Sequence, residues 1–135
     1  PGSFAPTAIR WGRDNRTCAF RLVGHGAGLR LENRIPGGDV NPYLAVAGII
    51  AAGLDGINKK MKLEPAFTGN AYVSDSPRVP STMNEALDLW EKSAWVKETF
   101  GDEVQAHYAN MARVEISAYA KAVTDWELFR NFERF

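Results

Sequence analysis

The sequence predicts an α+β fold, in which a few antiparallel strands come first and helices follow. Two observations carry this prediction. Apolar and polar residues alternate within the first 35 residues, where the alternating segments are separated by glycines, and from about residue 41 onward the apolar residues recur at helical spacing. The 135 residues suffice for one domain or a large piece of one. Because three short strands cannot close a sheet, we expect partner strands from outside this chain.

The composition is that of an ordinary globular protein, with 45% hydrophobic and 24% charged residues. Sixteen basic residues balance sixteen acidic ones, so we expect neither a nucleic-acid partner nor a membrane-surface partner. The longest apolar run, Leu44 to Leu54, is too short to span a membrane, and no signal-peptide pattern is expected at the start. The single cysteine, Cys18, favours a reducing compartment, and we expect the cytoplasm.

Three segments are predicted as strands: Thr7 to Trp11, Thr17 to Val23 and Leu29 to Ile35. The glycines between the second and third predict a turn that makes these two strands antiparallel neighbours. Their alternation places one set of side chains on an apolar face, namely Cys18, Phe20, Leu22, Leu29, Leu31 and Ile35.

The remaining chain is predicted to be mostly helical. Asn41 is a suitable N-cap and Pro42 a suitable first residue for a helix that runs to about Lys62. This helix is apolar almost all round, so we expect it to be buried on the apolar side of the sheet. After a loop, the further predicted helices are one capped by Thr82 and Glu85, one from Ser93 to Phe100, one capped by Asp102, and a tail with Trp126, Phe129, Phe132 and Phe135.

Charged residues occupy the other face of the third strand, where Arg30, Glu32 and Arg34 alternate. Arg21 joins them if the two strands pair, and Arg16 precedes the second strand. Guanidinium groups suit phosphate and carboxylate, so the pattern fits ATP, an acidic substrate and Mg²⁺ or Mn²⁺. A solvated strand face whose charges pair among themselves gives the same pattern, and the pattern alone leaves both readings open.

Several motifs occur in an order that resembles the glutamine synthetase family. They extend over roughly the first 60 residues, and the family's patterns are Pro-Gly-x-x-Ala-Pro, Asn-Arg-Ser-x-x-x-Arg, Arg-x-Glu-x-Arg, Asn-Pro-Tyr-Leu and Ala-Gly-Leu-Asp-Gly-Ile. The matching stretches here are Pro1 to Pro6, Asn15 to Arg21, Arg30 to Arg34, Asn41 to Leu44 and Ala52 to Ile57.

This resemblance implies a fold context and an activity. Residues 1–135 would be the C-terminal portion of a glutamine-synthetase-like catalytic domain, without its N-terminal β-grasp domain and upstream active-site strands. The whole protein would be an ATP-dependent ligase that joins glutamate to ammonia or a small amine through γ-glutamyl phosphate. It would use Mg²⁺ or Mn²⁺ and assemble into a homo-oligomer, a ring dodecamer by resemblance. The fragment alone is expected to be inactive.

The resemblance also implies roles for five residues. Glu32 would be one of the carboxylates that hold the catalytic metals. Arg34 would bind the glutamate carboxylate that is activated, and Arg16 would lie where glutamate meets the γ-phosphate, serving both glutamate and ATP. Arg21 and Arg30 would bind ATP phosphates. In these terms Arg16, Glu32 and Arg34 form the catalytic set.

The sequence departs from the family pattern at two points. Asn33 stands where valine is common, and the adenylylation motif Asn-Leu-Tyr-Asp-Leu-Pro is missing, so regulation by adenylylation is not expected. The stretches Arg30 to Leu44 and Val123 to Phe135 resemble the γ-glutamyl-polyamine and γ-glutamyl-monoamine ligases more than the assimilatory enzymes. The residues that choose between ammonia and an amine are expected upstream of this chain.

A second class of function stays open, a non-catalytic oligomeric scaffold or interaction module that keeps the glutamine synthetase fold. In that reading the arginine strand is a structural ion-pair ladder. Other polar candidates are interpreted structurally, because no metal-ligand spacing surrounds His25 or His107. Cys18 lies on the apolar strand face and is predicted to be a core residue.

Overall fold

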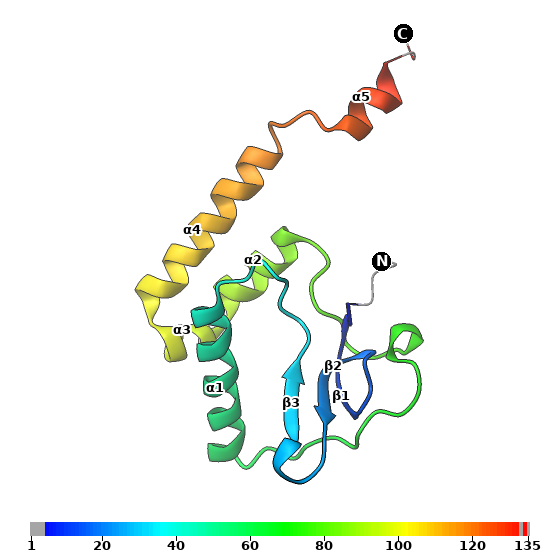
Figure 1. Ribbon diagram of the computed structural model, residues 1–135. Coiled ribbons are helices and arrows are strands. Elements are labelled where there is room, and N and C mark those ends of the chain that lie inside the picture. Colours follow the sequence, from blue (N-terminus) through cyan, green and yellow to red (C-terminus); the bar gives the residue numbers. More distant parts are fainter. Residues whose placement is uncertain (1–4, 133, 135) are drawn as a thin grey trace. The chain divides into compact units, whose positions relative to one another are not determined.

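The computed structural model describes residues 5–132 and 134, and it contains three strands followed by helices, as predicted (Figure 1). The chain divides into two compact units. The sheet unit comprises Pro1–Val79 and the helical unit Pro80–Phe135. The first residues of the Pro1 to Pro6 motif and the last aromatic residue, Phe135, lie outside the described residues. Within the described part of the chain, no helix has the length and apolar character needed to cross a membrane.

The sheet has the order β1 (Ala8–Arg13), β2 (Cys18–Val23) and β3 (Arg30–Asn33). β2 and β3 are antiparallel neighbours, which confirms the predicted hairpin (Figure 1). Their connection contains a 3₁₀ turn over Gly26–Gly28. Gly24 has a φ of +88°, and a Cβ there would lie 2.1 Å from the carbonyl oxygen of Gly28. This turn therefore requires glycine at its first position.

β1 and β2 pair in parallel, which differs from the expected all-antiparallel arrangement. Ala8 is aligned with Cys18 and Arg13 with Leu22, and the register is irregular in between. The chain turns back within Asp14 to Thr17, where Asp14 adopts a positive φ of 47°. Alternation of apolar and polar residues reports which face a side chain occupies and carries no information on strand direction. The sequence could not reveal this pairing for that reason.

The core of the sheet unit consists of small side chains. Ala8, Cys18 and Ala71 are fully buried, and Phe67 packs against them. Burial raises the pKa of the Cys18 thiol, so a core role is favoured over a nucleophilic one, as predicted.

The predicted loop after residue 62 follows the edge of β1 through backbone hydrogen bonds. Phe67 N donates to Trp11 O over 2.8 Å, and Val79 N donates to Thr7 O over 2.9 Å. A short 3₁₀ turn, Ala71–Val73, lies between these contacts. The loop therefore occupies the edge of the sheet that β2 leaves free.

Helix α1 (Pro42–Asn58) begins as predicted, because the side chain of Asn41 accepts hydrogen bonds from two backbone N–H groups of the first turn. The predicted burial is wrong, since none of its residues is buried and Ile57 is 72% exposed. The predicted packing on the sheet is wrong as well: Leu31 of the apolar face is 59% exposed. A helix that is apolar all round needs neighbours on every side, and the described residues do not supply them.

The helical unit contains α2 (Met83–Lys92), α3 (Ala94–Phe100), α4 (Asp102–Tyr119) and α5 (Asp125–Asn131). The capping box of Thr82 and Glu85 is present, as predicted. The predicted cap of α4 is wrong, because Gly101 occupies the N-cap position and Asp102 is the first helical residue. Asp102 instead forms an ion pair with Lys97 at 3.0 Å.

α2, α3 and α4 pack through an aromatic cluster. The Trp90 ring lies 6.0 Å from the rings of both Phe100 and Tyr108, measured between centroids. Trp90 Nε1 donates to the backbone oxygen of Gln105, and Gln105 Nε2 donates back to the oxygen of Trp90, each over 2.8 Å. This reciprocal pair fixes α2 against α4.

Candidate functional site

Four charged residues, Arg21, Arg30, Glu32 and Arg34, lie on one side of the β2–β3 hairpin, and we call this set the arginine face. The register of the two strands agrees with the predicted division of faces. Three pairs of residues lie opposite each other: Arg21 and Glu32, Leu22 and Leu31, and Val23 and Arg30. Directly opposed residues of antiparallel strands share a face. The ladder extends one residue further, because Arg34 N donates to Ala19 O over 2.9 Å. The candidate residues are therefore brought together by strand pairing.

Glu32 is the centre of the arginine face. Its Oε2 accepts from Arg21 Nη1 at 3.0 Å and its Oε1 from Arg30 Nη2 at 3.1 Å, while Arg34 Nη1 lies 3.9 Å from Oε2. Arg21 also donates to Asp14, with its Nε 3.0 Å from Oδ1. Because partner strands are expected from outside this chain, the sequence predicts a solvent-open face that is short of partners. That prediction is wrong for Arg21, whose side chain is paired with two carboxylates and is only 12% exposed.

The hydrogen bond from Arg21 holds the pKa of Glu32 below its usual value, although partial burial acts in the opposite direction. The same guanidinium lowers the pKa of Asp14. Both carboxyl groups are therefore ionised near neutral pH. Three arginines face two carboxylates, which leaves the cluster with a positive surplus that suits an anionic ligand.

Arg34 is less completely paired than Arg21. Its Nε is buried and has no hydrogen-bond partner within the described part of the chain. Leaving a buried donor unpaired costs about 1–3 kcal/mol of folding free energy, so a hydrogen-bond acceptor is expected beside such an atom. Arg34 thus keeps donor capacity for a group that the described residues do not provide.

Arg16 is separate from the arginine face. It lies in the turn between β1 and β2 and is exposed, and its charge contributes to lowering the pKa of Asp14. The turn borders a hollow of about 510 Å³. Its lining residues are Arg13, Asp14, Asn15, Arg16, Ala66, Phe67, Thr68 and Gly69. The hairpin register therefore brings together four of the five predicted residues and leaves Arg16 beside a neighbouring hollow.

Sequence reasoning missed three residues that shape this region. Asp14 ties Arg21, whereas Asn15 and Thr17 hold the turn that carries Arg16. An Asn followed two residues later by Thr is a pattern typical of an Asx turn. That local signal could have identified Asn15, but its contacts with residues 67–71 depend on the tertiary structure.

The described residues alone do not fit a divalent cation. They contain no group of three or more His, Cys, Asp or Glu side chains that could hold a metal ion. Both oxygens of Glu32 accept hydrogen bonds from arginine, so this carboxylate offers at most a share of a coordination sphere. A metal centre at this point would need further oxygen ligands from outside the chain.

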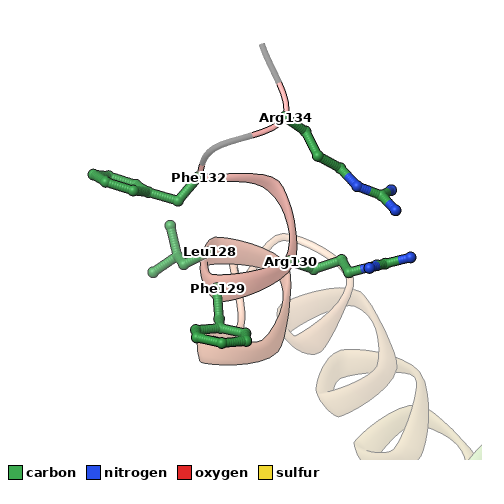
Figure 2. A pocket seen from close by; sticks show the side chains of 5 residues that line it. All are labelled: Leu128, Phe129, Arg130, Phe132 and Arg134. Carbon is green, nitrogen blue, oxygen red and sulfur yellow. The ribbon is translucent and has the colours of Figure 1, made fainter.

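A second hollow, of about 540 Å³, lies at the end of α5 and contains none of the predicted site residues. Figure 2 shows Arg130 and Arg134 pointing to one side of the helix, and Phe132 and Leu128 to the other. Phe129 is 90% exposed. The described side chains of this region form an amphipathic surface.

Comparisons with known proteins agree on one family. The family model described as glutamine synthetase, catalytic domain, matches residues 1–131. The chain is 65% identical over 134 residues to the gamma-glutamylethanolamide synthetase GlnA4 of Streptomyces coelicolor, covering 99% of this chain and 29% of that protein. It is 40% identical over 135 residues to the glutamate–isopropylamine ligase of a Pseudomonas species, covering 97% of this chain and 29% of that protein.

A solved structure gives the same result at the level of the fold. The GmaS/ADP complex matches with a TM-score of 0.82 and 30% identity, covering 96% of this chain and 30% of that one. The chain therefore spans less than a third of the length of each of these three proteins.

Proposed function

The chain belongs to the glutamine synthetase family, through its catalytic domain, and from this premise we propose that the whole protein is an ATP-dependent ligase that joins glutamate to an amine. In this proposal residues 1–135 form the C-terminal portion of the catalytic domain. The β-grasp domain and further active-site strands lie outside it. The observation that carries the proposal is the arginine face, where three guanidinium groups lie within ion-pair distance of the Glu32 carboxylate on one side of a hairpin.

The proposed chemistry has two steps. A γ-carboxylate oxygen of glutamate attacks the γ-phosphorus of ATP, ADP leaves, and γ-glutamyl phosphate forms. The nitrogen of the acceptor then attacks the γ-carbonyl carbon, loses a proton, and expels inorganic phosphate. Negative charge concentrates on the transferring phosphoryl group, which fixed cationic donors stabilise.

The residues of this chain have the following proposed roles. Arg21 and Arg30 bind ATP phosphates, and the contacts of Arg21 with Asp14 and Glu32 hold its guanidinium in place. Arg34 binds the carboxylate of glutamate that is activated, for which its unpaired Nε is a suitable donor. Arg16 reaches the junction of glutamate and the γ-phosphate from the neighbouring turn. Glu32 would be this chain's residue at a Mg²⁺ or Mn²⁺ centre, which would polarise the phosphoryl group and would need further oxygen ligands from outside this chain.

An amine is favoured over ammonia as the acceptor. Two relatives carry the names gamma-glutamylethanolamide synthetase and glutamate–isopropylamine ligase, and both names describe small primary amines as acceptors. The name of the solved GmaS/ADP complex supports a nucleotide site in that protein. We extend the proposal to a homo-oligomeric ring, and to the cytoplasm on the strength of the lone reduced cysteine.

The test is an assay of the whole purified protein with ATP, glutamate and one acceptor at a time: ethanolamine, isopropylamine, a polyamine or ammonia. We expect ADP release that depends on glutamate, together with the γ-glutamyl amide, identified by its mass. The isolated 135-residue chain should release no ADP, because its described residues contain no group of three or more side chains that could hold a metal ion. Absence of the amide with every acceptor would contradict the proposal.

The alternative is a non-catalytic scaffold that retains the fold. The observation in its favour is that Glu32 is satisfied by arginines of its own chain, as in a structural ion-pair ladder. The same assay separates the two functions, because a scaffold releases no ADP in response to glutamate.

A further inference from the structure

The turn between β1 and β2 is fastened to a distant segment by two side chains. Asn15 Nδ2 donates to the carbonyl oxygens of Gly69, at 2.9 Å, and Phe67, at 3.4 Å. Thr17 Oγ1 accepts from the backbone N–H of Ala71 at 2.9 Å. These contacts join residues 52 to 54 positions apart in the sequence. We call this set of hydrogen bonds the turn latch.

The two side chains of the turn latch also bind each other. Asn15 Oδ1 accepts from Thr17 Oγ1 at 2.7 Å and from Thr17 N at 3.0 Å. Thr17 Oγ1 therefore donates one hydrogen bond and accepts another, which uses both functions of the hydroxyl. Arg16 stands between these two residues, so its backbone is fixed on both sides.

The space around the turn latch is filled closely. A Cβ on Gly12 would lie 2.8 Å from Asn15 Cβ and 2.9 Å from the carbonyl oxygen of Phe67. The same segment forms one wall of the hollow that Arg16 borders. The turn latch thus sets both the position of Arg16 and the wall that faces it.

We propose that Asn15 and Thr17 are positioning residues, which hold Arg16 where the reaction needs it by fastening its turn to residues 67–71. This inference rests on the proposed function, because Arg16 itself is the residue that would contact glutamate and the γ-phosphate. Asn15 and Thr17 are given no substrate contact in this inference. Their effect on the reaction passes through the backbone of Arg16.

The test compares Thr17→Val with Thr17→Ser in the whole protein. Valine matches threonine in size but lacks the hydroxyl, whereas serine keeps the hydroxyl and loses only a methyl group. We expect Thr17→Val to lower kcat/KM for glutamate by about 10- to 100-fold, the loss that a displacement of about 1 Å can cause. Thr17→Ser should stay within about threefold of the wild type. Asn15→Asp, which removes the Nδ2 donors at constant size, is the second variant and should resemble Thr17→Val.

The structural readout is amide hydrogen exchange at Ala71, whose N–H donates a hydrogen bond to the Thr17 hydroxyl. Exchange should accelerate in Thr17→Val and remain slow in Thr17→Ser, with the fraction of folded protein matched by circular dichroism. A purely structural role would lower the Tm and leave kcat/KM per folded molecule unchanged, and that result would overturn the inference. Unchanged exchange at Ala71 would overturn it too. An inactive wild type would overturn the proposed function along with it, whereas an active wild type with an equally active Thr17→Val would overturn the positioning role alone.

Discussion

In the sheet unit, several side-chain hydrogen bonds join residues more than fifty positions apart, whereas in the described part of the helical unit most join residues within four positions and none spans as far. Trp11, Asn15 and Thr17 contact the segment 64–71. In the helical unit the polar contacts are mainly helix caps and i,i+4 pairs, such as Thr82 with Glu85. The exceptions are the hydrogen bonds between Gln105 and the Trp90 region, and the ion pairs of Lys97 with Asp102 and of Arg113 with Glu91.

This difference teaches where substitutions should affect function and where they should affect stability. In the sheet unit, ion pairs between neighbouring strand residues hold the arginine face, and hydrogen bonds over more than fifty positions hold the turn that carries Arg16. Local caps in the helical unit stabilise each helix separately. We therefore expect changes in the sheet unit to lower activity more than stability, and changes in the helical unit to do the opposite.

The largest expected effect is that of Glu32→Gln in the whole protein. The amide keeps the shape of the side chain but removes the charge that draws three guanidinium groups together. Activity should fall by orders of magnitude while the fold is retained, because Glu32 lies on the polar face of the hairpin. Steady-state ligase kinetics and circular dichroism measure the two effects.

The matched control is Glu85→Gln, which makes the same chemical change at a helix cap of the other unit. It should weaken the cap and leave kcat/KM nearly unchanged. Wild-type turnover in Glu32→Gln would contradict the proposed role of Glu32 at the active site. Equal losses of kcat/KM in both variants would contradict the expectation that changes in the sheet unit lower activity more than changes in the helical unit.

The next effect in size concerns the stability of the helical unit. Gln105 Nε2 donates to the carbonyl oxygens of Trp90, at 2.8 Å, and Ser93, at 3.2 Å. Gln105→Leu leaves these acceptors without that donor and should cost about 1–3 kcal/mol of unfolding free energy. Urea unfolding checks the cost, with Lys92→Met as a control at an exposed i,i+4 pair. A drop in activity larger than the drop in stability would contradict the contrast.

A smaller effect is expected at a helix cap. Thr82→Ala removes the hydroxyl that accepts from Glu85 N at 3.2 Å and should cost about 1 kcal/mol. Thr82→Ser keeps the hydroxyl and should restore most of that stability. Thermal unfolding of the two variants, compared at equal concentration, measures the difference. Equal Tm values for alanine and serine would show that the cap does not contribute.

The smallest effect is a dependence on pH. The pKa of Glu32 is lowered by its hydrogen bond with Arg21, and the pKa of Glu85 by hydrogen bonds from Ser81. A carboxyl group with a lowered pKa in the folded state adds stability above its unfolded pKa, and this stability is lost as pH falls through the folded pKa. The Tm should therefore decline on the acid side of the usual carboxyl range. Glu32→Gln should make that decline shallower, and an identical acid profile in the variant would refute the contribution of Glu32.

Much of the candidate site could be predicted from the sequence. The alternation of Arg30, Glu32 and Arg34 assigned one face, and the pairing expected across the glycine turn put Arg21 on the same face. The register then sets Arg21 directly opposite Glu32. The starts of α1 and α2 were predictable for a similar reason, since Asn41 and Thr82 are capping residues that act within their own turn. These features depend on residues that are close in the sequence.

The failures have a common physical cause. The burial of α1, the direction of β1 relative to β2, and the pairing of the arginine face all depend on what lies beside an element. The apolar surface of a helix indicates that it needs packing neighbours, but it does not indicate whether this chain supplies them. The alternation of apolar and polar residues in a strand indicates which face each side chain occupies, but it does not indicate the direction of the partner strand.

The sequence by itself determined the order of elements, the two faces of the hairpin and, through motifs of adjacent residues, the resemblance to the family. Only the tertiary structure decided that Glu32 gathers three arginines, and that Asn15 and Thr17 fasten the turn of Arg16 to residues 67–71. Periodicity and capping are set by covalent geometry over a few residues. Contacts across more than fifty residues exist only once the backbone has brought both segments together, so no local pattern encodes them.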